Sequence, residues 1–164
     1  MIVMKTIKPG RFQSAAFRKA IEAAANRAGN DILKDFKATT STWKHKPGFE
    51  KIVSYSPSPV EIMVATDDEI YGYVNNGTRP HPIFPKNAKA LAFPGVYSAK
   101  TTPGVIGSKP GGSSGPTVFA AYVQHPGTEA RHFDKVIQKK WGPLFKRRME
   151  RAMKEAAIAS GHGA

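Results

Sequence analysis

The strongest constraint on the fold is a helical repeat of apolar residues at each end of the chain. Apolar side chains recur every three or four positions between residues 12 and 42, and again from Phe133 to Ala156, which is the spacing of one helix face. Two long amphipathic helices are therefore predicted, each with a face that the rest of the chain must cover. The repeating residues are Phe17, Ile21, Ala24, Ala28, Ile32 and Phe36, and then Phe133, Ile137, Trp141, Phe145, Met149, Ala152 and Ala156.

Two glycine-containing pairs are expected to disturb these helices. Gly29-Asn30 lies inside the first, where a glycine costs roughly 1 kcal/mol relative to alanine, so a bend or short break is expected. Gly142-Pro143 lies inside the second and should break or kink it, because proline has no backbone N–H to donate and clashes with the preceding turn. Residues 160–164 are expected to be a frayed tail.

The middle of the chain has the pattern of short strands. Residues 52–55 and 60–64 flank a proline-rich turn and predict a hairpin. Asp67-Asp68 is expected to cap a short helical turn that ends at residues 75–77. Further strands are expected around residues 91–93 and over residues 117–123. The prediction is one α+β domain over residues 1–164, an antiparallel sheet packed by a long N-terminal helix and a C-terminal amphipathic basic helix.

One segment has little that could be buried. More than half of residues 103–116 are glycine or proline. We expect residues 98–116 to be a long flexible Gly/Pro-rich loop in the free protein, and to contact a neighbouring subunit on assembly.

Positive charge is concentrated at the two ends. The chain has 25 Lys and Arg against 12 Asp and Glu, a net charge of +13. Residues 1–50 carry +6, residues 51–130 carry +1 and residues 131–164 carry +6. Two basic helical faces around a nearly neutral middle suit contact with DNA or with an acidic protein surface. The candidate contact residues are Lys139, Lys140, Lys146, Arg147, Arg148 and Arg151.

Composition also narrows the class of protein. The absence of cysteine excludes a disulfide scaffold, a thiolate metal site and a cysteine nucleophile. No apolar stretch approaches 18 residues, and the first residues are too short for a signal peptide. We therefore expect a soluble, unexported protein with no membrane partner.

Catalytic and cofactor-binding patterns are weak throughout. The segment Gly107-Ser108-Lys109-Pro110 lacks the order of a phosphate-binding loop, and there is no Gly-x-Ser-x-Gly motif. A metal site and a stacking platform for single-stranded nucleic acid are open alternatives, but both residue sets more often have structural roles. We predict no enzyme, no cofactor and no metal site. The metal candidates are His81, His125, His132 and Glu129, and the stacking candidates are Tyr71, Tyr73 and Tyr122.

Three segments together carry a recognisable signature: residues 73–81 (YVNNGTRPH), 85–93 (PKNAKALAF) and 123–133 (VQHPGTEARHF). In this order they resemble the tail-component proteins of lambdoid siphophages, which are small neck or tail-completion proteins. Two departures are His132, where such proteins often have proline, and Pro143 in the last helix. The motif residues are Tyr73, Gly77, Thr78, His125, Pro126, Gly127, Thr128 and Phe133.

These motif residues have plausible structural roles. Gly77 and Gly127 permit tight turns, Thr78 and Thr128 can hydrogen-bond local backbone, and Phe133 can plug the sheet where the last helix begins.

The resemblance implies a structural virion protein that acts in tail completion or head-to-tail joining. It implies a ring, expected to be hexameric, stacked between the tail tube or tail terminator and the head connector, with DNA passing through its channel. Such a protein is assembled in the cytoplasm of the host bacterium and is part of the neck of the finished virion. The alternative is a basic module that grips the phosphates of duplex nucleic acid, and a weaker alternative is a small hydrolase or toxin.

Overall fold

The computed structural model describes residues 14–55 and 60–162. Its elements confirm the α+β class, although the strands form three separate two-stranded antiparallel sheets instead of one. No helix in these ranges is long and apolar enough to cross a membrane. The elements are α1 (Ser14–Thr39), β1 (Glu50–Tyr55), β2 (Val60–Ala65), α2 (Glu69–Asn76), β3 (His81–Ile83), β4 (Leu91–Ser98), β5 (Gly112–Ala120), β6 (Val123–His125) and α3 (Phe133–Ala159).

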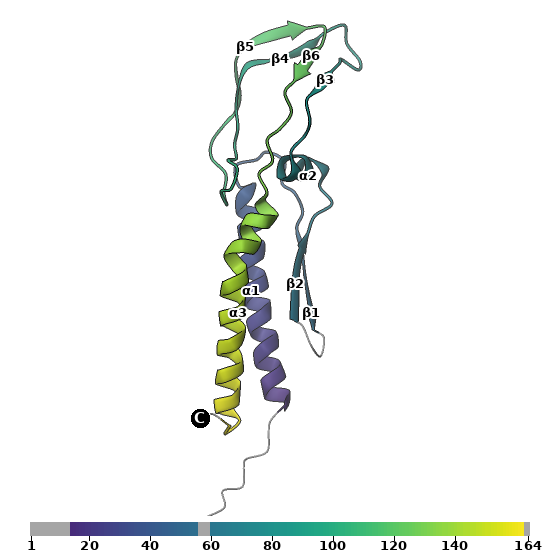
Figure 1. Cartoon of the computed structure of the whole chain (residues 1–164). Coiled ribbons are helices and arrows are strands. Elements are labelled where there is room, and N and C mark those ends of the chain that lie inside the picture. Colours follow the sequence, from purple (N-terminus) through teal and green to yellow (C-terminus); the bar gives the residue numbers. More distant parts are fainter. Residues whose placement is uncertain (1–13, 56–59, 163–164) are drawn as a thin grey trace, which may run out of the picture.

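The two long helices lie side by side and antiparallel, as Figure 1 shows. Ala24 and Ala28 of α1, and Ala152 and Ala156 of α3, are buried. Alanine side chains allow two helix axes to approach closely, because little volume separates the backbones. The alanines of the two predicted apolar stripes thus lie in the contact between the helices.

Neither long helix is broken at its expected position, and a bend in α1 or a kink in α3 stays a prediction. α1 runs through Gly29, which is buried because β1 packs there: a Cβ at this position would lie 2.8 Å from Cδ of Lys51. α3 runs as one helix through Pro143. The residue before a proline is pushed out of the helical conformation largely by its Cβ, which Gly142 lacks. Close packing of β1 explains the glycine at position 29, and the missing Cβ of Gly142 explains why α3 continues through Pro143.

The strand pair of the hairpin and the short helix were predicted correctly, and the proline-rich turn at residues 56–59 lies outside the described residues. β1 and β2 pair in antiparallel register, with Ile52 opposite Met63, and pack against α1. Asp68 caps α2 by accepting a hydrogen bond from the backbone N–H of Tyr71 at 2.7 Å. The helix ends at Gly77, whose φ is +76°.

The aromatic core lies where α2 meets the adjoining ends of the two long helices. Tyr71, Phe133 and Ile137 are almost completely buried. The ring of Tyr71 stacks on Phe133 with centroids 5.8 Å apart and meets Phe49 edge-on at 5.0 Å. Phe133 therefore packs on α2, and does not plug a sheet as the sequence suggested. Partly buried neighbours of this cluster include Ile32, Phe36, Trp43, Val74, Ile106 and Trp141.

Beyond α2 the chain forms a bent two-stranded ribbon, which we call the β arch and define as residues 78–98 and 112–128 (upper part of Figure 1). It begins at a bridge between Thr78 and Thr128, continues as β3 paired with β6, and ends as β4 paired with β5. The strand expected over residues 117–123 is in fact divided between β5 and β6. β4 and β5 pack mainly on each other, whereas the helices pack on each other and on the first hairpin.

The Gly/Pro-rich segment is more structured than predicted. Ser98 and residues 112–116 belong to β4 and β5. The remaining loop returns to the end of α1, where Ser108 Oγ lies 2.9 Å from Ser41 Oγ and the Thr42 hydroxyl donates to the Lys109 carbonyl at 3.0 Å. The hydroxyl groups of Ser41 and Thr42, which follow α1, thus supply hydrogen bonds that hold this loop against the body of the molecule. The flexibility of this loop stays a prediction.

The expected frayed tail is also corrected over residues 160–162. Gly161 adopts a φ of +76°, and its N–H bonds to the Ile158 carbonyl at 2.9 Å while that of His162 bonds to the Ala157 carbonyl at 2.9 Å. These two bonds form a Schellman cap that satisfies the last carbonyls of α3. Residues 163 and 164 lie outside the described ranges.

Candidate functional site

The two Gly-Thr motifs, 50 positions apart in sequence, meet in the structure. The Thr78 N–H donates to the Thr128 carbonyl at 2.9 Å, and the Thr128 N–H donates to the Thr78 carbonyl at 3.2 Å and to the Thr78 hydroxyl at 2.9 Å. We call this pair of motifs, residues 77–78 and 127–128, the Gly-Thr clasp. The Thr78 hydroxyl thus bonds distant backbone and not the local backbone that the sequence suggested.

Both glycines of the clasp are required by its geometry. Gly77 and Gly127 have φ values of +76° and +89°, where an L side chain is strained. A Cβ on Gly77 would lie 2.7 Å from the Thr128 carbonyl oxygen, and one on Gly127 would lie 2.3 Å from that of Thr78. Each motif therefore needs glycine because the other motif's backbone is pressed against it.

A second set of bonds ties α2 to the start of α3. The Arg131 N–H donates to the Val74 carbonyl at 3.1 Å, and the His132 N–H donates to the Asn75 carbonyl at 2.9 Å. His132 has a φ of +51°, which is unusual for a residue with a side chain. The clasp and these bonds together hold the chain on both sides of the β arch at one place on the body of the molecule.

The structure does not bring all eight motif residues to one place. Gly77, Thr78, Gly127 and Thr128 form the clasp, and Phe133 lies in the core below it. The other motif residues lie apart from that contact: Tyr73 is exposed on α2, Pro126 is exposed beside the clasp, and His125 faces His81 across the β3–β6 pair.

The histidines do not assemble a metal site. His81 and His125 have ring centroids 5.1 Å apart, but Nδ1 of His125 accepts the Gly127 N–H at 3.0 Å. A neutral His125 therefore carries its proton on Nε2, which leaves that nitrogen without a lone pair for a metal ion. Across residues 14–55 and 60–162, no group of three or more His, Asp or Glu side chains could hold one.

The three tyrosines also do not form a stacking platform. Tyr71 is buried in the core, whereas Tyr73 is exposed on α2 and Tyr122 is exposed in the β arch. Tyr122 instead stacks on Phe84, with centroids 6.0 Å apart. Nothing places the three rings on a common surface.

The six candidate basic residues divide into two groups. Lys140 donates to Asp35 at 2.6 Å, and Arg148 donates to Asp31 at 2.8 Å, and both cations lie 5.5 Å from the ring centroid of Trp141. These two therefore join α3 to α1. Within the described ranges the other four are exposed and form no ion pair: Lys139, Lys146, Arg147 and Arg151.

Asp35 and Asp31 were not predicted from the sequence to be the partners of Lys140 and Arg148. Asp35 also accepts the indole N–H of Trp141 at 2.7 Å and so bonds two residues of α3. Their spacing of four on one helix was the available signal, since it places both carboxylates on the same face.

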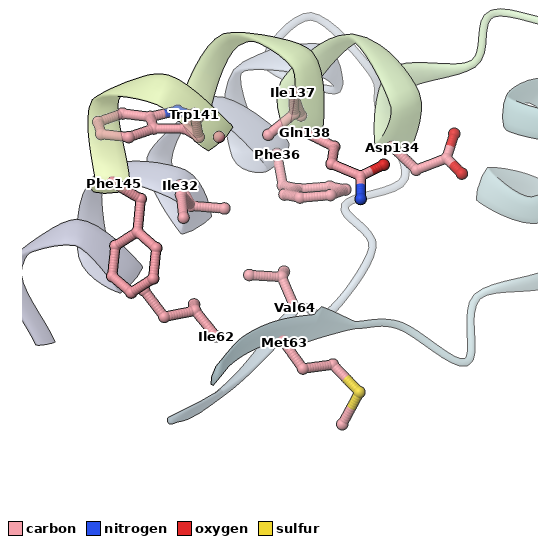
Figure 2. A pocket seen from close by; sticks show the side chains of 11 residues that line it. Ile32, Phe36, Ile62, Met63, Val64, Asp134, Ile137, Gln138, Trp141 and Phe145 are labelled. Carbon is pink, nitrogen blue, oxygen red and sulfur yellow. The ribbon is translucent and has the colours of Figure 1, made fainter. Parts of the chain in front are cut away.

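An apolar groove runs between the helix pair and the β1–β2 hairpin, and Figure 2 shows its side chains. It has a volume of about 380 Å³ and continues into a second groove of about 830 Å³ along the same helices, with Phe145 in both. In the first groove only Asp134 and Gln138 supply polar side chains, so it has no acid and base arranged for catalysis. The main apolar lining residues are Ile32, Phe36, Ile62, Val64, Ile137, Trp141 and Phe145.

Asp68 and Tyr71 are titratable groups beside the aromatic core whose pKa values are shifted for structural reasons. A hydrogen bond with His45, supported by the backbone N–H of Tyr71, lowers the pKa of Asp68. Burial raises the pKa of Tyr71 to about 12. The nearby Thr39 hydroxyl lowers that pKa in part, but it donates to the Phe36 carbonyl. The Tyr71 oxygen has no partner in hydrogen-bonding geometry among the described residues.

Comparison of the chain with protein-family models, with curated proteins and with solved structures found no match.

Proposed function

We propose that this chain is a structural protein of a phage virion that acts in tail completion or head-to-tail joining as a ring around the DNA channel. The observation that carries the proposal is the Gly-Thr clasp, because it joins the two motifs on which the resemblance to siphophage tail-component proteins rests. Motif residues that fit together as a backbone junction support a role in shape and assembly.

The rest of the described surface is consistent with a structural role. The apolar groove lacks an arranged acid and base, and the histidines do not converge on a metal site. The β arch projects from the helical body (Figure 1), as a subunit that contacts neighbours would require. A ring subunit presents two different surfaces to its neighbours, and an elongated body with an arch at one end provides them.

The alternative, a module that binds duplex nucleic acid, is favoured by one observation. Lys139, Lys146, Arg147 and Arg151 are exposed on α3 with no carboxylate held against them within the described part of the chain. Four unpaired cations on one helix can neutralise phosphates. The same cations would face DNA in the channel of a ring, so this property fits both functions.

The proposal is tested by electron microscopy of particles assembled without this protein in the phage whose genome encodes it. We expect separate heads and tails, or tails of the wrong length, and recovery of joined particles when the protein is supplied in trans. Normal, infectious virions in its absence would overturn the proposal. Supplying the Gly127→Ala variant tests the role of the clasp, and it should restore joining poorly.

A further inference from the structure

Large apolar side chains are exposed along the β arch. Tyr97 and Phe119 are each 73% exposed, far more than a side chain that packs in the same subunit. Large apolar side chains that are exposed on one element often belong to an interaction surface. The main exposed residues are Phe84, Val96, Tyr97, Val118, Phe119 and Tyr122.

The arch also has unpaired strand edges. Among the strands of residues 14–55 and 60–162, β4 pairs only with β5, and β3 only with β6, so each of these strands has one edge without a partner there. A two-stranded ribbon is marginally stable in water unless a further strand or a helix covers it. Natural proteins usually protect such edges with charged side chains, particularly lysine.

The strands of the arch lack that protection. Residues 90–99 and 110–128 contain no Asp, Glu, Lys or Arg, in a chain whose net charge is +13. Two copies of the chain would repel each other through their basic helical faces, because like charges raise the free energy of association. Repulsion between two copies is weakest at β4 and β5, which contain no charged residue, so the charge distribution favours a second copy of the chain as the partner of these two strands.

We propose that the β arch is a self-association surface, at which two copies meet through β4 and β5 and cover Phe119 and the apolar side chains on its face of the ribbon. This contact buries apolar side chains and provides each ribbon with an additional strand. We expect this surface, and not the Gly/Pro-rich loop, to be the main contact between copies, because that loop forms hydrogen bonds within its own subunit. The inference concerns the purified protein and holds whether or not the protein acts in a virion.

The test compares two single substitutions at exposed apolar sites. Phe119→Lys places a charge in the arch, and Ile158→Lys places the same charge near the end of α3, where the side chain is 54% exposed. Both side chains lie at the surface, so both variants should fold, which circular dichroism and thermal unfolding check. Light scattering and sedimentation velocity over a range of concentrations then give the mass of each protein.

We expect the unaltered protein to self-associate, Phe119→Lys to raise the dissociation constant about tenfold or more, and Ile158→Lys to leave it unchanged. Association should persist or strengthen at high salt, because the contact contains no charges and salt screens the repulsion between basic faces. A protein that stays monomeric at all concentrations, or association that Phe119→Lys leaves unchanged, would overturn the proposal. So would binding to lipid vesicles through Phe119 by a protein that is monomeric without them.

A second measurement uses the absence of native cysteine. Ser113→Cys, in β5, should cross-link two copies with a short bifunctional maleimide, and a cysteine at Ile158 should not. Failure of Ser113→Cys to cross-link at concentrations where the protein associates would place the contact elsewhere. Normal virions without the protein would overturn the proposed function, but they would not affect the cross-linking result.

Discussion

At the residue scale, the structure depends most on a few positions where one segment's backbone touches another's. Gly77 and Gly127 lie at such positions, and each is pressed against a carbonyl of the other motif. His132 adopts a left-handed conformation because its N–H and the Arg131 N–H both bond to the end of α2. The geometry of these residues decides how the β arch joins the helical body.

Gly127→Ala should lower the free energy of unfolding by more than about 2 kcal/mol, because it adds strain at a positive φ and a clash with the Thr78 carbonyl. The matched control is Gly72→Ala in α2, where a Cβ would have no neighbour within 4 Å. That change should raise stability by about 0.5–1 kcal/mol. Urea unfolding followed by circular dichroism measures both, and similar effects of the two changes would contradict the clasp.

Tyr71→Phe should leave stability unchanged or raise it by up to about 1 kcal/mol, because the hydroxyl that it removes is buried with no hydrogen-bond partner in the part of the chain that the structure describes. Tyr71→Ala should instead lose about 3–5 kcal/mol by opening a cavity in the aromatic core. Chemical denaturation distinguishes the two. A large loss in Tyr71→Phe would reveal a hydrogen bond to that oxygen.

The raised pKa of Tyr71 also predicts how the stability difference between the unaltered protein and Tyr71→Phe depends on pH. The unfolded phenol ionises near its ordinary pKa of 10.0, whereas the folded one stays protonated to about 12. The stabilising contribution of the neutral phenol is therefore complete below pH 10 and is lost as the pH rises toward 12. The difference in stability between the unaltered protein and Tyr71→Phe should change over that interval and be constant between pH 6 and 9.

At the scale of an element, α3 shows how a local defect is tolerated. It spans Phe133–Ala159 although Pro143 removes one hydrogen-bond donor from its interior. The helix survives because Phe133, Ile137, Ala152 and Ala156 are buried on both sides of the defect. Most helical stability in proteins comes from packing of this kind and little from intrinsic propensity.

Pro143→Ala should therefore stabilise the protein by up to about 3 kcal/mol, because it restores the hydrogen bond that proline cannot donate. The control is Lys139→Ala, one turn earlier at an exposed position, which should change stability by less than about 0.5 kcal/mol. Thermal unfolding measures both. Destabilisation by Pro143→Ala would mean that the proline shapes a bend on which the packing depends.

At the scale of the whole molecule, charge and apolar surface are separated. Basic residues are frequent along α3, whereas β4 and β5 of the β arch contain no charged residue and carry exposed aromatic side chains. Each property therefore favours a different partner: polyanions or acidic surfaces along the helices, and another apolar surface at the arch.

If the helical face binds duplex DNA, the logarithm of the binding constant should fall with the logarithm of salt concentration with a slope of about −3 to −4 for four contacted phosphates. The double change Lys146→Gln and Arg147→Gln should reduce that slope by about 2 and leave stability unchanged. Lys140→Gln should instead affect stability, because Lys140 bonds Asp35. Fluorescence anisotropy with labelled duplex measures the slope, and no dependence on salt would exclude phosphate binding.

Periodicity and capping were enough to predict both long helices, the first hairpin and the Asp68 cap of α2, because such signals act within a few residues. They could not show that Asp31 and Asp35 bond to residues of α3 more than 100 positions away. They also could not show that Gly29 accommodates a strand, or that hydroxyl groups after α1 bind the Gly/Pro-rich loop. Glycine looks like a break in a sequence unless its neighbours in space are known.

The candidate site divides in the same way. The Gly-Thr motifs stand out in the linear sequence as positions for tight turns, but their meeting across 50 residues depends on the register of the β arch. The basic residues of α3 could be identified from their order along the chain, whereas tertiary packing decided that Lys140 and Arg148 bond to α1 and that the other four stay exposed. Short-range order is encoded in neighbouring residues, and the choice of partner is made only when distant segments compete for the same surface.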